Sequence, residues 1–116
     1  MKFQINEQDH YVLITLGEEK IDSSISPELK GQFINLSSKN PDKHIIIDLT
    51  KVRFADSSGL SAFLLAHRMV RDHSKLCIFV NAGPSIIDLF EISQLIKVFP
   101  LADSVDEAIA MLNPMK

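Results

Sequence analysis

Two adjacent serines, Ser57 and Ser58, invite a chemical explanation because of where they lie. They follow an apolar run at residues 45–49 and precede a helical pattern that extends from about residue 58 to 72. The first turn of a helix has unpaired N–H groups and a partial positive charge, and both stabilise an anion. A serine hydroxyl at such a place is suited to accept a reversible phosphate, which adds a charge of about −1.5 to −2.

The simpler interpretation is that both serines cap the helix, since serine is among the preferred N-cap residues. Spacing alone favours this interpretation. We expect Ser57 at or just before the N-cap and Ser58 near the first helical position. Gly59 has no Cβ atom and therefore leaves room for another backbone to approach.

The strands that must position these serines are visible as apolar patterns. Residues 2–6 alternate between apolar and polar side chains, and a short polar connection joins them to a second strand at 11–16, which predicts a β-hairpin. Continuous apolar runs at 44–49 and 76–80 are typical of strands that are covered on both faces. A short edge strand is expected at 96–99.

Helices are predicted between these strands. Ser26 is expected to be the N-cap of the first helix. In the helix over about 58–72 an apolar side is predicted, with His67 as a packed residue. The last helix is expected to open with a capping box formed by Ser104 and Glu107 and to end at Asn113 and Pro114.

After the hairpin, helices and strands alternate along the chain. This order predicts a mainly parallel sheet with helices packed against it. The expected fold class is α/β, with a mixed sheet and about four helices in a single domain over residues 1–116. Sites in such sheets collect outside the carboxyl ends of the strands, and the two serines lie just past one such end.

Composition limits the classes of function. The 116 residues carry a net charge of −3, which gives no electrostatic basis for binding nucleic acid or an anionic membrane. The single cysteine, Cys77, is expected to be a small core side chain in a reducing cytosol. The first residues lack the apolar region of a signal peptide, and no segment approaches the ~20 apolar residues of a membrane span. We therefore expect a cytoplasmic protein.

Residues 56–60, Asp-Ser-Ser-Gly-Leu, closely resemble the signature of the STAS domain family. Within that family the chain is similar to the anti-sigma-factor antagonists. The resemblance extends over nearly the whole chain, from the opening hairpin and the connection at 17–22 to a later helix with Asp-Leu-Phe at 88–90. It implies a STAS-like domain over residues 1–116.

The resemblance also implies a role for each residue of the site. In the phosphorylated subgroup, the first serine of the pair is phosphorylated by a partner that is both a serine kinase and an anti-sigma factor, which assigns the acceptor role to Ser57. The unphosphorylated protein binds this partner and so releases the sigma factor. Phosphorylation blocks the binding, and a PP2C-type phosphatase restores it. The partner-binding residues that the resemblance implies are Asp22, Asp56, Ser57, Ser58, Gly59 and Leu60.

On this interpretation the protein is not an enzyme and needs no cofactor, because the partner supplies the nucleotide, the metal and the catalytic base. A monomer is the default expectation for the free protein. Two positions depart from the family pattern. The connection from Gly17 to Asp22 is longer than usual and has Lys20 where an acid is common, and Ser61 stands where glycine is often found.

Three rival chemistries fit the residues less well. A phosphoaspartate receiver could use Asp48, but the early strand lacks a following acidic pair for Mg²⁺. A hydrolase could pair Ser57 with His67 or His73, but a Gly-x-Ser-x-Gly elbow is missing. The histidines and Cys77 lack paired metal-ligand spacing. A stronger alternative is a STAS module that no kinase phosphorylates, acting as an interaction subunit of another signalling or transport assembly.

Overall fold

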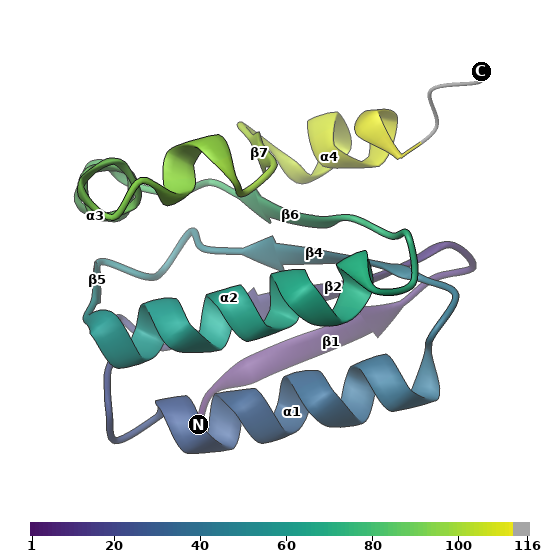
Figure 1. The fold of residues 1–116 in the computed structure, drawn as a ribbon, viewed down its shortest axis with the longest axis horizontal. Helices are drawn as coiled ribbons and strands as arrows, with labels where there is room; N and C mark the ends of the chain where they lie inside the picture. Colours follow the sequence, from purple (N-terminus) through teal and green to yellow (C-terminus); the bar gives the residue numbers. More distant parts are fainter. Residues whose placement is uncertain (113–116) are drawn as a thin grey trace.

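The computed structural model describes residues 1–112 and has a five-stranded mixed sheet at its centre (Figure 1). The strands, in spatial order, are β1 (Phe3–Glu7), β2 (Tyr11–Leu16), β4 (His44–Asp48), β6 (Cys77–Val80) and β7 (Leu101–Ala102). β1 pairs with β2 in antiparallel fashion, and the other pairs are parallel. The expected hairpin and the mainly parallel sheet are therefore confirmed.

Four α-helices cover the two faces of the sheet. α1 (Ser26–Lys39), α2 (Ser57–Arg71) and α3 (Pro84–Ile92) pack on one face around the larger core cluster. α4 (Val105–Met111) covers a smaller cluster on the other face, over Ile46, Ile78 and Val80. Because both faces are covered at the centre, every residue of β6 is buried. The predicted fold class, α/β with a mixed sheet and four helices, is confirmed.

A second, two-stranded sheet lies at the end of the molecule where α2 begins. β3 (Lys20–Ile21) pairs in parallel with β5 (Phe54–Ala55), with Ile21 opposite Ala55. This sheet has no signal in the sequence, because two residues are too few for a periodic pattern. It brings the connection after β2 directly beside the residues that precede Ser57.

Two predicted elements are corrected by the structure. Ser26 is not the N-cap of α1: Ile25 occupies that position, and Ser26 is the first residue of the helix. The edge strand expected at 96–99 is wrong, because a 3₁₀ helix, η1 (Leu95–Lys97), occupies that segment and the edge strand is β7 instead. The amide of Phe99 donates to the carbonyl of Leu95, so a local hydrogen bond replaces the strand pairing that the apolar pattern suggested.

The start of α4 matches its prediction in part. Ser104 is the N-cap, and its hydroxyl accepts from the amide of Glu107 at 3.1 Å. The Glu107 carboxylate reaches past Ser104 and accepts instead from the amide of Asp103, at 3.1 Å. The predicted helix end at Asn113 and Pro114 lies outside the described residues.

Cys77 lies in the interior, as expected, and burial raises the pKa of its thiol far above the usual range. Over residues 1–112, no helix is both long enough and apolar enough to cross a membrane.

Candidate functional site

Asp56 begins α2. It is the N-cap residue, and its Oδ1 accepts from the amides of Ser58 and Gly59 at 2.9 and 3.1 Å. The Ser58 hydroxyl donates to the same oxygen at 2.6 Å. The predicted cap is thus wrong by one residue: an aspartate rather than a serine caps the helix, and Ser57 is its first residue.

The two serines differ in their surroundings. Ser57 is exposed, and over residues 1–112 its hydroxyl makes no hydrogen bond. Ser58 is half-buried, and its hydroxyl is held by Asp56. The two hydroxyls therefore differ in accessibility: Ser57 presents its hydroxyl at the surface, whereas the hydroxyl of Ser58 is directed to Asp56.

The charge of Asp56 is stabilised where it lies. The Ser58 hydroxyl, followed by the amide of Gly59, holds the pKa of the Asp56 carboxyl below its usual range. These donors include the amides that the sequence analysis expected to stabilise a phosphate. A phosphate on Ser57 would therefore find two N–H groups of the first turn already bonded to a carboxylate.

Gly59 is buried, and a close backbone contact explains why. A Cβ atom at position 59 would lie 2.3 Å from the carbonyl oxygen of Ile21 in β3. That carbonyl also accepts from the amide of Asp56 at 3.3 Å. The expected approach of another backbone to Gly59 is therefore an internal contact between β3 and the start of α2.

Asp22 follows β3 and lies at the same end of the molecule as Ser57. Its side-chain Oδ1 accepts from the amide and the hydroxyl of Ser24, at 3.0 and 2.6 Å. Its carbonyl accepts from the amides of Ile25 and Ser26, which leads the chain into α1. The pairing of β3 with β5 thus brings the predicted site residues Asp22 and Asp56 to neighbouring positions.

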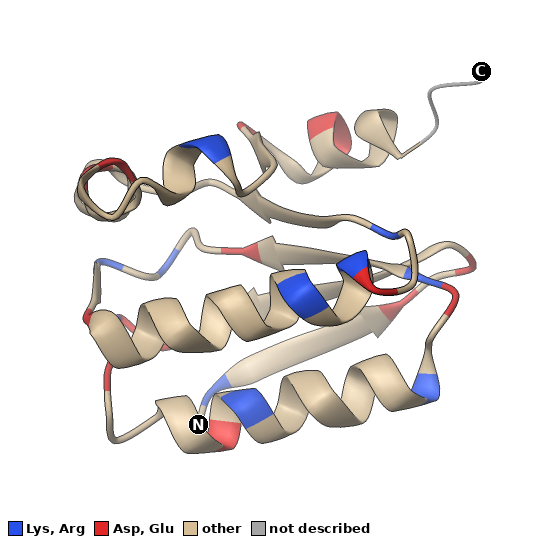
Figure 2. Ribbon diagram, in the orientation of Figure 1, with Lys and Arg blue, Asp and Glu red and all other residues tan. Residues whose placement is uncertain are grey.

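Leu60 lies half-buried on the side of α2, packed against the larger core cluster. The first part of α2 carries no charged side chain, as Figure 2 shows, and the basic residues Arg68 and Arg71 lie in its last turn. The surface around Ser57 is therefore an uncharged helix start with carboxylates at Asp22 and Asp56 beside it.

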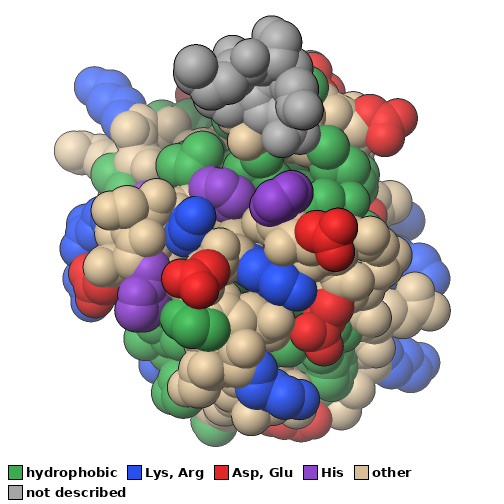
Figure 3. All heavy atoms as spheres, turned by 90° about the vertical axis from the view of Figure 1, so that its right-hand side faces the viewer, with side chains coloured by type: hydrophobic (Ala, Val, Ile, Leu, Met, Phe, Trp, Pro, Cys, Tyr) green, Lys and Arg blue, Asp and Glu red, His purple; other side chains and the backbone are tan. Residues whose placement is uncertain are grey.

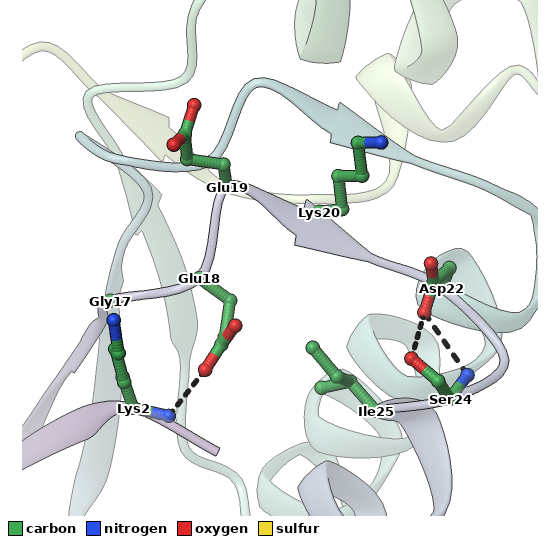
Figure 4. Close-up of a pocket in the computed structure, with 8 residues that line it drawn as sticks. All are labelled: Lys2, Gly17, Glu18, Glu19, Lys20, Asp22, Ser24 and Ile25. Atoms are coloured by element: carbon green, nitrogen blue, oxygen red, sulfur yellow. Dashed lines mark hydrogen bonds between the residues drawn. The ribbon is translucent and has the colours of Figure 1, made fainter.

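An open hollow of about 440 Å³ lies next to this surface, and the sequence analysis missed it. Figure 4 shows Asp22 and Ser24 on one side of the hollow and Lys2 and Glu18 on the other. The Glu18 carboxylate accepts from the backbone amide of Lys2 at 2.6 Å. The only signal for the hollow in the sequence was the unusual length of the connection at 17–22.

The rival chemistries find little support in this geometry. His67 lies further along α2, where its ring packs against Phe99 with centroids 5.5 Å apart. Its Nδ1 is buried without a hydrogen-bond partner among residues 1–112, and His67 lies well along α2 from Ser57, the first residue of that helix. In the part of the chain that the structure describes, no three His, Cys, Asp or Glu side chains are grouped so as to hold a metal ion.

Comparison with known proteins gives consistent matches. A family model described as STAS domain matches residues 2–108. The anti-sigma F factor antagonist of Paenibacillus polymyxa is 26% identical over 114 residues, which cover 97% of each chain.

Among solved structures, the unphosphorylated form of the anti-sigma factor antagonist SpoIIAA has a TM-score of 0.75 at 20% identity, covering 97% of this chain and 98% of that one. The phosphorylated form of SpoIIAA from Bacillus has a TM-score of 0.71 at 22% identity, covering 96% and 99%. At these identities the structural likeness establishes a shared fold.

Proposed function

The chain belongs to the STAS domain family, and we propose that it is an anti-sigma-factor antagonist whose binding is switched by phosphorylation of Ser57. In its unphosphorylated form it binds a partner that is both a serine kinase and an anti-sigma factor, and a sigma factor is released. The full-length similarity to the anti-sigma F factor antagonist supports the general role. The protein is then a binding module and a kinase substrate rather than an enzyme.

The difference between the hydroxyls of Ser57 and Ser58 is the observation that supports the proposal most directly. Ser57 is exposed, and its hydroxyl bonds to no other residue in the described part of the chain, whereas the hydroxyl of Ser58 donates to Asp56. To phosphorylate Ser58, a kinase would have to break the hydrogen bond from the Ser58 hydroxyl to Asp56. Phosphorylation of Ser57 needs no such rearrangement. This difference supports Ser57 as the acceptor independently of the family resemblance.

Phosphorylation acts on this surface through charge and desolvation. The new phosphate would stand one residue from Asp56, whose carboxylate already accepts from the amides of Ser58 and Gly59. The phosphate therefore gains little from the helix start and remains directed to solvent. A partner that packs closely against an uncharged hydroxyl would have to desolvate a charge of about −1.5 to −2, which opposes binding.

The other predicted site residues contribute in different ways. Asp22 and Leu60 supply a carboxylate and an apolar contact beside Ser57. Asp56 and Ser58 fix the helix start, and Gly59 permits β3 to approach it. A PP2C-type phosphatase resets the switch, and the protein acts in the cytoplasm as a monomer when free.

Intact-mass measurement with site mapping tests the acceptor. The protein is incubated with ATP and the serine-kinase anti-sigma factor encoded in the same genome. We expect one phosphate on the wild type and on Ser58→Ala, and none on Ser57→Ala. Full phosphate incorporation by Ser57→Ala would refute the assignment. If no kinase phosphorylates the wild type, the alternative role as an unphosphorylated STAS interaction subunit is favoured.

A further inference from the structure

Ser26 connects the two helices that meet at the site. The residue is 3% exposed, and its hydroxyl donates to the carbonyl oxygen of Ser58 at 2.8 Å. Ser26 is the first residue of α1, and Ser58 is the second residue of α2. This is a hydrogen bond between segments that lie 32 residues apart in the sequence.

This bond does not serve the usual purpose of a serine at a helix start. A serine at the N-cap usually accepts from an amide of its own helix, but Ser26 lies one residue past the N-cap, Ile25. The hydroxyl of Ser26 instead donates outward, to a carbonyl of the neighbouring helix. A carbonyl oxygen can accept two hydrogen bonds, so Ser58 can also take part in the hydrogen bonding within α2.

Two further contacts fix the same helix start from the same side. The Ile21 carbonyl accepts from the amide of Asp56, and it occupies the space that a side chain at Gly59 would need. The amides of Arg53 and Phe54 both donate to the carbonyl of Glu19. The chain from 19 to 26 therefore holds the residues on either side of Ser57, and Ser26 is the buried polar residue of this segment.

We propose that Ser26 is a positioning residue for the switch. Its hydroxyl holds the first turn of α2 against the Asp22 segment, so that the acceptor Ser57 and the carboxylate of Asp22 are presented to the partner in a fixed relative position. The link to a partner rests on the function proposed above. The positioning of the helix start by Ser26 does not depend on that function.

Loss of the Ser26 hydroxyl should affect the free protein as well as its phosphorylation. Without the Ser26 hydroxyl, the first turn of α2 loses one support and opens more often. A hydrogen bond of this kind shifts such an equilibrium by roughly threefold to tenfold. The amide protons of Ser58 and Gly59, which are bonded to Asp56, should then exchange faster with solvent.

The test compares Ser26→Ala with Ser37→Ala. Ser37 is also buried in α1 but lies near the other end of the helix, so it controls for the same chemical change. NMR measurement of amide exchange should give roughly threefold to tenfold faster exchange at Ser58 and Gly59 in Ser26→Ala only. The near-isosteric Ser26→Cys, whose thiol is a weak donor, should show the same trend and replaces the alanine variant if that variant does not fold.

The kinase assay adds a second measurement. We expect kcat/KM for phosphorylation to fall by a similar factor in Ser26→Ala and to stay unchanged in Ser37→Ala. Unchanged exchange at Ser58 and Gly59 would overturn the proposal whatever the kinase does. Faster exchange in a protein that no kinase phosphorylates would support the positioning by Ser26 and refute the proposed function.

Discussion

Asp56, Ser57, Ser58 and Gly59 each perform a separate task at the start of α2. Asp56 accepts the hydrogen bonds of the first turn, and Ser58 donates to it. Gly59 lets the Ile21 carbonyl approach, and Ser57 remains exposed. Three of the four residues therefore support the helix start, and the fourth, Ser57, presents an exposed hydroxyl.

Gly59→Ala is expected to destabilise the fold by at least about 2 kcal/mol, because its Cβ would lie 2.3 Å from a backbone carbonyl that cannot easily move. Gly31 is a matched control in α1, since a Cβ there would contact nothing within 4 Å. Gly31→Ala should stabilise by about 0.5–1 kcal/mol through its better helix propensity. Urea denaturation of both variants measures the difference, and a shift of the same sign in both would contradict this explanation.

At this scale the sequence predicted a helix start at the two serines and the close approach of a backbone to Gly59, and the roles of the site residues stay predictions. It misplaced the cap by one residue, because aspartate and serine are about equally good N-caps and propensity cannot choose between neighbours. The hydrogen bond from Ser26 to Ser58 could not be predicted, since it depends on the packing of two helices that are distant in the sequence.

Among the elements, the two short strands, β3 and β5, determine which segments meet at the candidate site. β3 and β5 bring the segment after β2 beside the start of α2. The longer strands and helices were predictable from apolar periodicity and start signals. β3 and β5 were not, because their pairing arises from tertiary contacts rather than from a local pattern.

The opposite end of the sheet contains a titratable contact between two elements. Figure 3 shows histidine side chains gathered at that end, among basic and acidic neighbours. His44, in β4, accepts from the amide of Leu76 through Nδ1 at 2.9 Å, next to the start of β6. Burial, followed by the charges of Lys75 and His10, lowers the pKa of His44 below its ordinary value of 6.5.

This contact predicts a pH dependence of stability. The folded state favours neutral His44, so its contribution is fully present above about pH 6.5 and decreases as the pH falls below that value. Thermal unfolding at pH 7.5 and 5 should show a smaller loss of Tm in His44→Asn than in the wild type. His73→Asn, at an exposed position, serves as the control. An equal loss in the wild type and in His44→Asn would contradict the role of this contact.

Across the whole molecule, the proposed phosphorylation site lies on the face of the sheet that holds the larger core cluster. α4 covers one face of the sheet, whereas α1 and α2 lie together on the other, with Ser57 at the start of α2 (Figure 1). The sequence predicted this layered arrangement because strands covered on both faces have continuous apolar runs. It did not predict the hollow beside Asp22, because the hollow depends on how the connection at 17–25 folds beside Lys2.

Substitution of Ala108 tests how much α4 contributes to the stability of the fold. Ala108 is fully buried against the outer face of the sheet. Ala108→Asp would bury an unpaired carboxylate and is expected to cost at least about 2 kcal/mol in the free energy of unfolding. Ala110, exposed on the same helix, is the control, and Ala110→Asp should change stability by less than about 0.5 kcal/mol. Similar losses in both variants would show that α4 does not pack as described.

On the function proposed above, a phosphate on Ser57 decides whether the partner binds. The most direct measurement is the dissociation constant of the complex with the serine-kinase anti-sigma factor, determined for the protein before and after phosphorylation. We expect phosphorylation to weaken binding at least about tenfold, equivalent to about 1.4 kcal/mol. Ser57→Ala should bind as tightly as the unphosphorylated wild type, before and after treatment with the kinase. Equal affinity of the phosphorylated and unphosphorylated wild type would contradict the claim.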